Sequence, residues 1–211
     1  MTNVHDNLII TFPCPPESGR TYSLTLASHL GQMLEMAEQR FGPRDKSYTI
    51  LGFEFWAGLP QIWFPGNGKN VIVQLDSANL NDQNLPLLQM AHECVHLLSP
   101  VLPANVSVLE EGLATYFSKE YMASHVGGVW FTGDQKCGHA EILARKLLLL
   151  NADAIKALRK IVSVISQATA QDILKICPNL PSHLSEQLVA SFQSWDGNIR
   201  SVGAKSSKFH L

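Results

Sequence analysis

The order of elements in this sequence predicts an α+β fold, in which a small N-terminal sheet of mixed or antiparallel strands is followed by helices. Three observations predict it. The β-prone segments all lie before residue 76. Two helical patterns follow, over residues 85–98 and 107–122. From residue 139 to residue 193 the apolar residues recur only at helical spacing.

The N-terminal part provides the strands and one helix. Leu8–Phe12 is apolar and β-prone, and the prolines after it end the segment. Tyr22–Phe41 has apolar residues at helical spacing, and Gly42 and Pro43 stop the helix. Three short strands are expected next. They are Ser47–Phe55, Gln61–Phe64 and Asn70–Leu75. The last two form a hairpin across the turn at residues 65–68, and the final strand lies at the sheet edge.

The two central helices have clear start signals. Polar residues 81–84 can cap a helix that begins at Leu85, and Pro100 closes it. After a loop, Ser107 opens a second helix with Glu110 three residues later. This S-V-L-E sequence predicts a capping box, in which the Glu110 side chain bonds to the Ser107 backbone.

Helices are expected over residues 139–150, 153–166, 170–176 and 183–193, with Asp153, Thr169 and Ser182 as N-caps. The chain therefore divides into a part over 1–135 with the sheet and both central helices, a helical subdomain over 136–195, and a polar, flexible tail over 196–211.

Composition indicates a globular protein. Of the 211 residues 45% are hydrophobic and 16% charged, and the formal net charge is -2. A chain so close to neutral has no bulk electrostatic reason to bind nucleic acid or an anionic membrane, so neither partner is expected.

Nothing in the sequence resembles a secretory signal or a membrane span, since the longest apolar runs are short. The four cysteines are scattered and form no C-x-x-C pair, which favours free thiols in a cytoplasmic protein. The alternative is a mature secreted chain whose leader has been removed.

The most informative segment is His92-Glu93-Cys94-Val95-His96, which lies inside an apolar helical pattern. Residues i and i+4 share one face of a helix, so both imidazoles can point at one tetrahedral Zn²⁺ ion. Glu93 lies one step around the helix and can reach a water on the metal as general base. Cys94 points away and is expected to pack as a small apolar residue.

The structural alternative is that two histidines and a carboxylate lie on a buried helix face and bond to other groups. That arrangement is costly, because an ionised Glu93 among apolar neighbours needs a partner. A catalytic zinc takes three protein ligands, and Glu110-Glu111-Gly112 on the next helix offers a third.

The motif H-E-C-V-H followed by V-L-E-E-G-L-A-T-Y-F resembles the gluzincin group of zinc peptidases over residues 85–122. The resemblance implies a zincin-like fold, with an active-site helix and a Glu-bearing helix. It also implies zinc held by His92, His96 and Glu111, and a peptide or protein substrate. Glu110 already has a role as the capping partner of Ser107, which also favours Glu111 as the ligand.

Other residues are candidates for supporting roles around the metal. Gly112 and Ala114 would let their helix approach the H-E-x-x-H helix closely, and Thr115 or a backbone carbonyl would accept a hydrogen bond from a ligand histidine. A further group should stabilise the oxyanion, and the candidates, each of which has ordinary packing as an alternative, are Tyr116, Tyr121, His125 and His139.

The expected reaction is hydrolysis of a peptide bond by a metal-activated water, with Glu93 moving the proton. By analogy with the group, Asn70–Leu75 as an edge strand would pair with the substrate backbone, although a plain sheet edge is an equal alternative. Two other functions stay open, namely a non-catalytic zinc-containing interaction module and a hydrolase of non-peptide amides.

Overall fold

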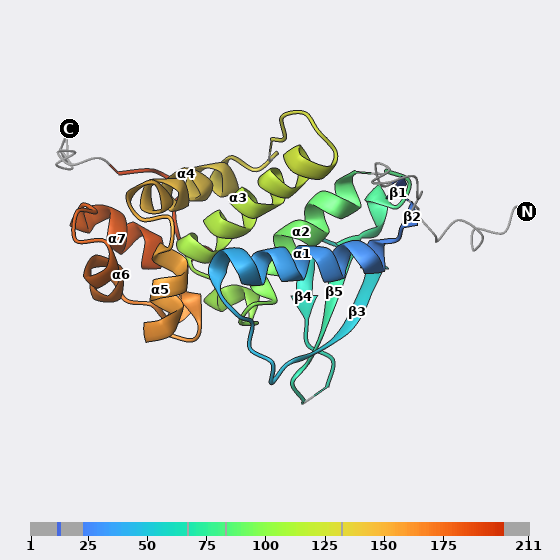
Figure 1. Ribbon diagram of the computed structural model, residues 1–211, viewed down its shortest axis with the longest axis horizontal. Coiled ribbons are helices and arrows are strands. Elements are labelled where there is room, and N and C mark those ends of the chain that lie inside the picture. Colours follow the sequence, from blue (N-terminus) through green and yellow to red (C-terminus); the bar gives the residue numbers. More distant parts are fainter. Residues whose placement is uncertain (1–11, 14–22, 67, 83, 132, 201–211) are drawn as a thin grey trace, which may run out of the picture.

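The computed structural model describes residues 12–13, 23–66, 68–82, 84–131 and 133–200. These residues form an α+β structure with a small mixed sheet and a larger number of helices, as the sequence predicts (Figure 1). A two-residue pairing of β1 (Phe12–Pro13) with β2 (Ser23–Leu24) precedes the main elements. Most of the predicted strand Leu8–Phe12 lies outside the described residues.

The sheet has three strands in the order β3-β5-β4. β3 (Thr49–Trp56) runs parallel to β5 (Asn70–Asp76), and β4 (Gln61–Trp63) runs antiparallel to β5. The predicted β4–β5 hairpin is therefore confirmed. The prediction that Asn70–Leu75 lies at the edge is wrong, because β5 is the central strand and β4 is an edge.

The composition of β5 explains its central place. Val71, Val73 and Leu75 are fully buried, and Gln74 between them is 7% exposed. A nearly continuous run of buried residues is typical of a strand inside a sheet. β4 pairs with only part of β5 along one edge, and β3 pairs with the whole of β5 along the other.

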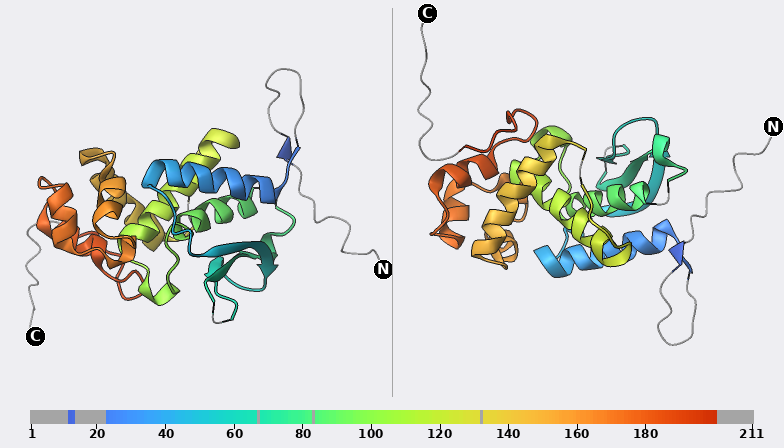
Figure 2. Two further views of the ribbon diagram at one scale, coloured as in Figure 1. Left: turned by 60° about the horizontal axis from the view of Figure 1, so that its bottom comes forward. Right: turned by 90° about the horizontal axis from the view of Figure 1, so that it is seen from above.

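Two helices lie on the same side of this sheet (Figure 2). α1 (Leu26–Phe41) is capped by Thr25, whose side chain accepts a hydrogen bond from the Ser28 amide. It ends at Gly42, whose φ of 100° suits a residue without a side chain. α2 (Leu85–His96) packs beside α1 and against β5, and its apolar face is buried.

α3 (Val108–His125) lies between this α/β part and the remaining helices (Figure 1). Most of its residues are buried, because α2 packs on one side of it and α4 on the other. The first turn of α3 faces α2 at the end where α2 presents His92 and His96. This arrangement brings the two motifs of the sequence together.

The C-terminal part is helical, and its four helices gather beside α3: α4 (Gln135–Leu150), α5 (Ala154–Ile161), α6 (Ala170–Ile176) and α7 (Ser182–Val189). Short 3-10 turns complete the described elements: η1 (Ser77–Asn79), η2 (Pro103–Asn105) and η3 (Ile165–Gln167). The helical character was predicted, but several bounds differ.

The helix starts explain these differences. α4 begins before the predicted residue 139 because the Asp134 side chain accepts hydrogen bonds from the Lys136 and Cys137 amides. The Thr169 cap is confirmed as a full capping box. Asp153 is the N-cap residue of α5, as predicted, but its side chain makes no cap bond. The cap at Ser182 was wrong, since Ser182 is the first residue inside α7 and Pro181 is the N-cap.

Gly112 sets the distance between α3 and α4. A Cβ atom built on Gly112 would lie 2.3 Å from the carbonyl oxygen of Ala140 and 3.0 Å from the Cβ of Ala144. The sequence correctly marked Gly112 as a point of close helix contact. The predicted neighbour was wrong, because the helix that approaches Gly112 is α4 and not α2.

Residues 196–200, which the sequence places in the flexible tail, form hydrogen bonds with α4 and α7. The carbonyl of Gly197 hydrogen-bonds with His139 Nδ1 of α4 at 2.6 Å, and the Arg200 amide donates to Gln187 Oε1 of α7 at 2.9 Å. Residues 201–211 lie outside the described residues.

Candidate metal centre

The side chains of His92, His96 and Glu111 meet between α2 and the first turn of α3. The two histidine Nε2 atoms are 3.3 Å apart. One carboxylate oxygen of Glu111 lies 3.3 Å from His92 Nε2, and the other lies 3.6 Å from His96 Nε2. Each Nε2 atom therefore lies close to the other imidazole and to one oxygen of the Glu111 carboxylate, and one ligand atom from each residue lies within 4.8 Å of the other two.

These separations suit the ligands of a tetrahedral zinc ion. Zinc binds imidazole nitrogen and carboxylate oxygen at about 2.0–2.2 Å, so two ligands of one tetrahedral ion lie roughly 3.3–3.6 Å apart. All three observed separations fall in that range. Two imidazoles with one carboxylate is also a donor set that zinc accepts. Among the described residues, these three are the group of histidine, cysteine and acidic side chains able to hold a metal ion.

Glu110 supports this centre from behind. Its side chain is 1% exposed, and its Oε1 accepts a hydrogen bond from His96 Nδ1 at 2.9 Å. This bond fixes the ring so that Nε2 points to the other two candidate ligands. The predicted capping box is only half correct. The Ser107 hydroxyl accepts from the Glu110 amide, but the Glu110 carboxylate turns to His96.

Thr115 does not have the role that we expected. Its hydroxyl is buried and has no hydrogen-bond partner among the described residues, so it accepts no hydrogen bond from a ligand histidine. The carboxylate of Glu110 takes that role for His96. The sequence did contain a signal, since Glu110 is next to Glu111, but the capping box offered a competing explanation.

Glu93 lines the same cavity as His92 and Glu111 and is 4% exposed. Burial raises the pKa of Glu93, against the opposing influence of His96 and His92. None of the described residues donates a hydrogen bond to its carboxylate. Glu93 is thus a buried acid that faces a cavity beside the candidate ligands, which is the placement that a general base needs.

Two of the candidate ligands, His96 and Glu111, have strongly shifted pKa values. Burial lowers the pKa of His96, but the hydrogen bond and charge of Glu110 outweigh it and raise the pKa to about 9. Burial raises the pKa of Glu111, but the charges of His92 and His96 and a bond to His92 outweigh it and lower the pKa to about 2. The centre of the metal-free protein therefore favours an anionic Glu111 carboxylate beside a protonated His96.

Cys137 of α4 also contacts the centre. Its thiol donates to Glu111 Oε1 over 3.4 Å. Burial, followed by the charges of Glu111 and Asp134, raises the pKa of this thiol. Cys137 therefore stays protonated and orients Glu111. Cys94 is fully buried, as predicted for a residue that points away from the metal.

A cavity of about 440 Å³ opens over the centre. His92, Glu93 and Glu111 lie on its floor, and α2, α3, the β3–β4 connection, α4 and the chain after α7 form its walls. The walls are largely apolar through Leu59, Pro60, Leu85, Leu88, Phe131 and Phe192. Leu59 is 80% exposed and Phe131 is 77% exposed, so apolar side chains flank the mouth of the cavity.

The four candidates for oxyanion stabilisation do not line this cavity. Tyr116 bonds to Arg40 and Glu120, and Tyr121 bonds to His29 at 2.6 Å. His125 stacks on Tyr121, and His139 bonds to the Gly197 carbonyl. Their hydrogen-bonding groups are directed into packing contacts, which was the alternative for each.

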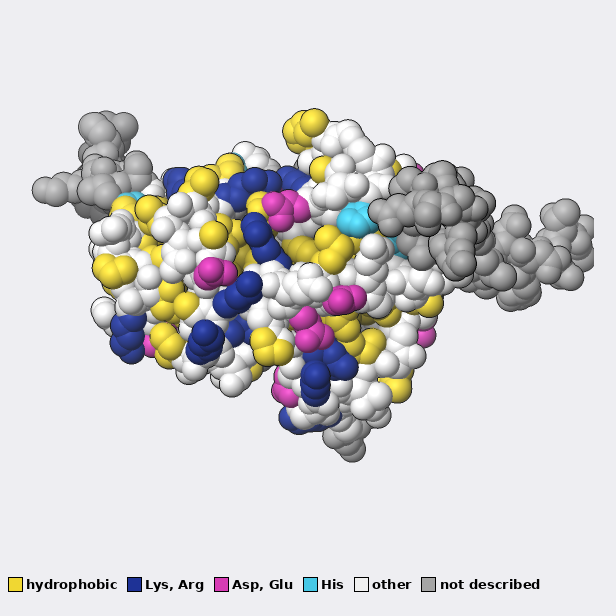
Figure 3. Space-filling view, viewed as in Figure 1, with side chains coloured by type: hydrophobic (Ala, Val, Ile, Leu, Met, Phe, Trp, Pro, Cys, Tyr) yellow, Lys and Arg dark blue, Asp and Glu magenta, His cyan; other side chains and the backbone are white. Residues whose placement is uncertain are grey.

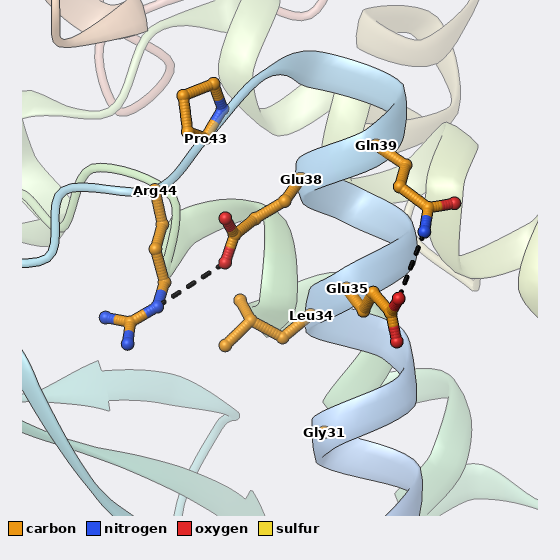
Figure 4. Close-up of a pocket in the computed structure, with 7 residues that line it drawn as sticks. All are labelled: Gly31, Leu34, Glu35, Glu38, Gln39, Pro43 and Arg44. Carbon is orange, nitrogen blue, oxygen red and sulfur yellow. Dashed lines mark hydrogen bonds and ion pairs between the residues drawn. The ribbon is translucent and has the colours of Figure 1, made fainter.

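A larger hollow of about 540 Å³ lies along α1 but has no reactive chemistry (Figure 4). Its charged side chains have partners within the hollow, Arg44 with Glu38 at 3.5 Å and Glu35 with Gln39 at 3.2 Å. Basic and acidic side chains are likewise interspersed over the face of the molecule in Figure 3. The cavity over His92 and Glu111 is therefore the better candidate for a functional site.

Comparison of the chain with protein-family models, with curated proteins and with solved structures found no match. In the part of the chain that the structure describes, every helix is too short or too polar to cross a bilayer. The geometry of the centre is therefore the basis on which a function is assigned.

Proposed function

We propose that this protein is a zinc-dependent peptidase with a zincin-like, gluzincin-type active site. One observation supports this above all. The Nε2 atoms of His92 and His96 lie 3.3 Å apart, and each has an oxygen of Glu111 within 3.6 Å, which is the spacing of ligands around one tetrahedral ion. Adjacent to them, Glu93 faces an open cavity. A purely structural zinc site is closed by four ligands and needs no base beside it.

A bound zinc ion supplies Lewis acidity, which polarises a carbonyl and makes water acidic near neutral pH. The protein's own residues do the rest. Glu93 accepts a proton from the attacking water and returns it to the leaving amine. Its raised pKa favours the first step, since a base of higher proton affinity takes the proton from water more readily.

The cavity favours a polypeptide substrate. Its apolar walls, which include Leu88 and Phe192, offer space for a side chain next to the scissile bond. The edge strand beside the cavity is β4 and not β5, so any pairing with substrate backbone takes place along β4. Leu59 and Pro60, which line the cavity, directly precede β4.

The test combines metal analysis with a hydrolysis assay on an unfolded protein. Wild-type protein is expected to hold about one zinc per chain, and His96→Ala to hold none. Glu93→Gln should keep the zinc and the fold but lose at least about a hundredfold in rate. Zinc without hydrolysis in the wild type would favour the interaction module, and hydrolysis restricted to small amides would favour a non-peptide substrate. Absence of zinc from wild type would reject the proposal.

A further inference from the structure

Ser166 lies far from the metal-binding motifs in sequence but touches the residues that support them. It is part of η3, in the C-terminal helical region. Its hydroxyl donates a short hydrogen bond to Glu110 Oε2 and accepts one from the Ser107 amide at 2.8 Å. The Ser107 amide is the group that a complete capping box would have satisfied with Glu110. Ser166 therefore accepts the hydrogen bond from the Ser107 amide in place of the Glu110 carboxylate. The Glu110 carboxylate can then face His96.

Both oxygens of the Glu110 carboxylate are consequently occupied. Oε1 accepts from His96 and Oε2 accepts from Ser166. A carboxylate that is bonded at both oxygens is held in one orientation. The Glu110 carboxylate therefore fixes the direction of the hydrogen bond that it accepts from His96. Because the side chain of Glu110 is 1% exposed, water does not substitute for either partner.

Backbone hydrogen bonds also join the C-terminal region to the start of α3. The Val108 amide donates to the Ala190 carbonyl at 2.9 Å, and the Phe192 amide donates to the Val106 carbonyl at 2.8 Å. These bonds join the chain after α7 to the start of α3. The C-terminal region is thereby fixed against the turn that carries Glu110 and Glu111.

We propose that Ser166 is a positioning residue for the metal centre, which acts through Glu110 to orient His96. This inference rests on the proposed function in that it requires zinc at His92, His96 and Glu111. The C-terminal helical region would then contribute to zinc affinity without providing a ligand.

A matched pair of variants tests the role of the hydroxyl. Ser166→Thr keeps the hydroxyl and adds a methyl group, for which a cavity of about 340 Å³ beside Ser166 leaves room. Ser166→Val has the same shape as threonine without the hydroxyl. The zinc dissociation constant is measured by competition with a chromophoric chelator. We expect Ser166→Thr to stay within about twofold of wild type and Ser166→Val to bind zinc about tenfold more weakly.

A double-mutant cycle with Glu110→Gln separates positioning from general stability. If Ser166 acts through the carboxylate, adding Ser166→Val to Glu110→Gln changes zinc affinity by less than about twofold. As a control, Ser185 is a buried serine in α7 whose hydroxyl donates to a backbone carbonyl at 2.7 Å. Ser185→Ala should lower the melting temperature without changing zinc affinity.

The outcomes are distinct. Equal zinc affinity of the threonine and valine variants, in a wild-type protein that binds zinc, would overturn this inference and leave the proposed function intact. An equal loss from Ser166→Val with and without Glu110→Gln would also overturn it. A wild-type protein that binds no zinc would overturn both.

Discussion

The α2–α3 pair and the C-terminal helical region contribute to the candidate centre in different ways. The pair provides the three candidate ligands and Glu93, all within the first turn of α3 and the last two turns of α2. The C-terminal region provides the contacts that hold those side chains, through Cys137 on Glu111 and Ser166 on Glu110. Ligands thus come from local helical spacing, and their orientation comes from packing between distant segments.

The largest expected effect concerns a ligand on α3. Glu111→Ala should weaken zinc binding by more than about a hundredfold, because two imidazoles alone do not complete a zinc site. The measurement is the zinc content after dialysis against a weak chelator. Glu186→Ala, on α7, is the control for the loss of one acidic side chain. Retention of zinc by Glu111→Ala would remove Glu111 from the centre.

A change behind the ligands should have a smaller effect. Glu110→Gln keeps the shape of the side chain but loses its charge, so His96 is less firmly held. We expect zinc affinity to fall between about tenfold and a hundredfold. Chelator competition measures this, and an unchanged affinity would show that the His96–Glu110 bond does not support the metal.

The pH dependence should differ between metal-free and zinc-loaded protein. In the metal-free protein, His96 contributes stability that is complete below its ordinary pKa of 6.5 and is lost as pH rises through about 9. Glu111 contributes stability that is complete above its ordinary pKa of 4.5 and is lost as pH falls through about 2. The two contributions to the stability of the metal-free protein are therefore both complete between pH 4.5 and 6.5.

Zinc must displace the proton of His96, so zinc affinity should instead rise with pH up to about 9. Thermal unfolding with chelator and with excess zinc, from pH 4 to 9, compares the two states. Parallel pH profiles in both states would contradict the assigned proton on His96.

Helix packing gives the next test. Gly112→Ala should lower the free energy of unfolding by about 2 kcal/mol, because the added methyl meets the backbone of Ala140. Gly31→Ala in α1 is the control, since nothing lies within 4 Å of its added Cβ. Gly31→Ala should stabilise the protein by about 0.5–1 kcal/mol through helix propensity. Urea unfolding measures both, and equal effects would contradict the close α3–α4 contact.

The smallest expected effect comes from Cys137. Cys137→Ala removes one weak hydrogen bond to Glu111, so zinc affinity should fall by no more than about threefold. Cys177→Ala, at a buried cysteine, serves as the comparison. A loss as large as that of Glu111→Ala would indicate that Cys137 itself binds the metal.

The sequence predicted the elements and the candidate ligands because both depend on short-range periodicity. Residues His92 and His96 share a helix face whatever lies around them. The sequence failed where two elements compete for one partner. β5 had two possible neighbours, and only the assembled sheet shows that β3 occupies the second side.

Glu110 and Gly112 show the same limit at single residues. The capping box was a sound local expectation for Glu110, but His96 and Ser166 offer its carboxylate two partners in a buried environment. Gly112 indicated a close approach without saying from which helix. No local pattern marks Ser166 or Cys137, because their partners lie 56 and 26 residues away.

The pairing of residues 106–108 with 190–192 has a consequence for synthesis. The ribosome synthesises the chain from its N-terminus. The candidate ligands therefore emerge before Ser166 and the segment after α7. A nascent chain can therefore meet metal ions while the groups that align its imidazoles are still being made. The centre reaches its final form only after residue 192 has left the exit tunnel.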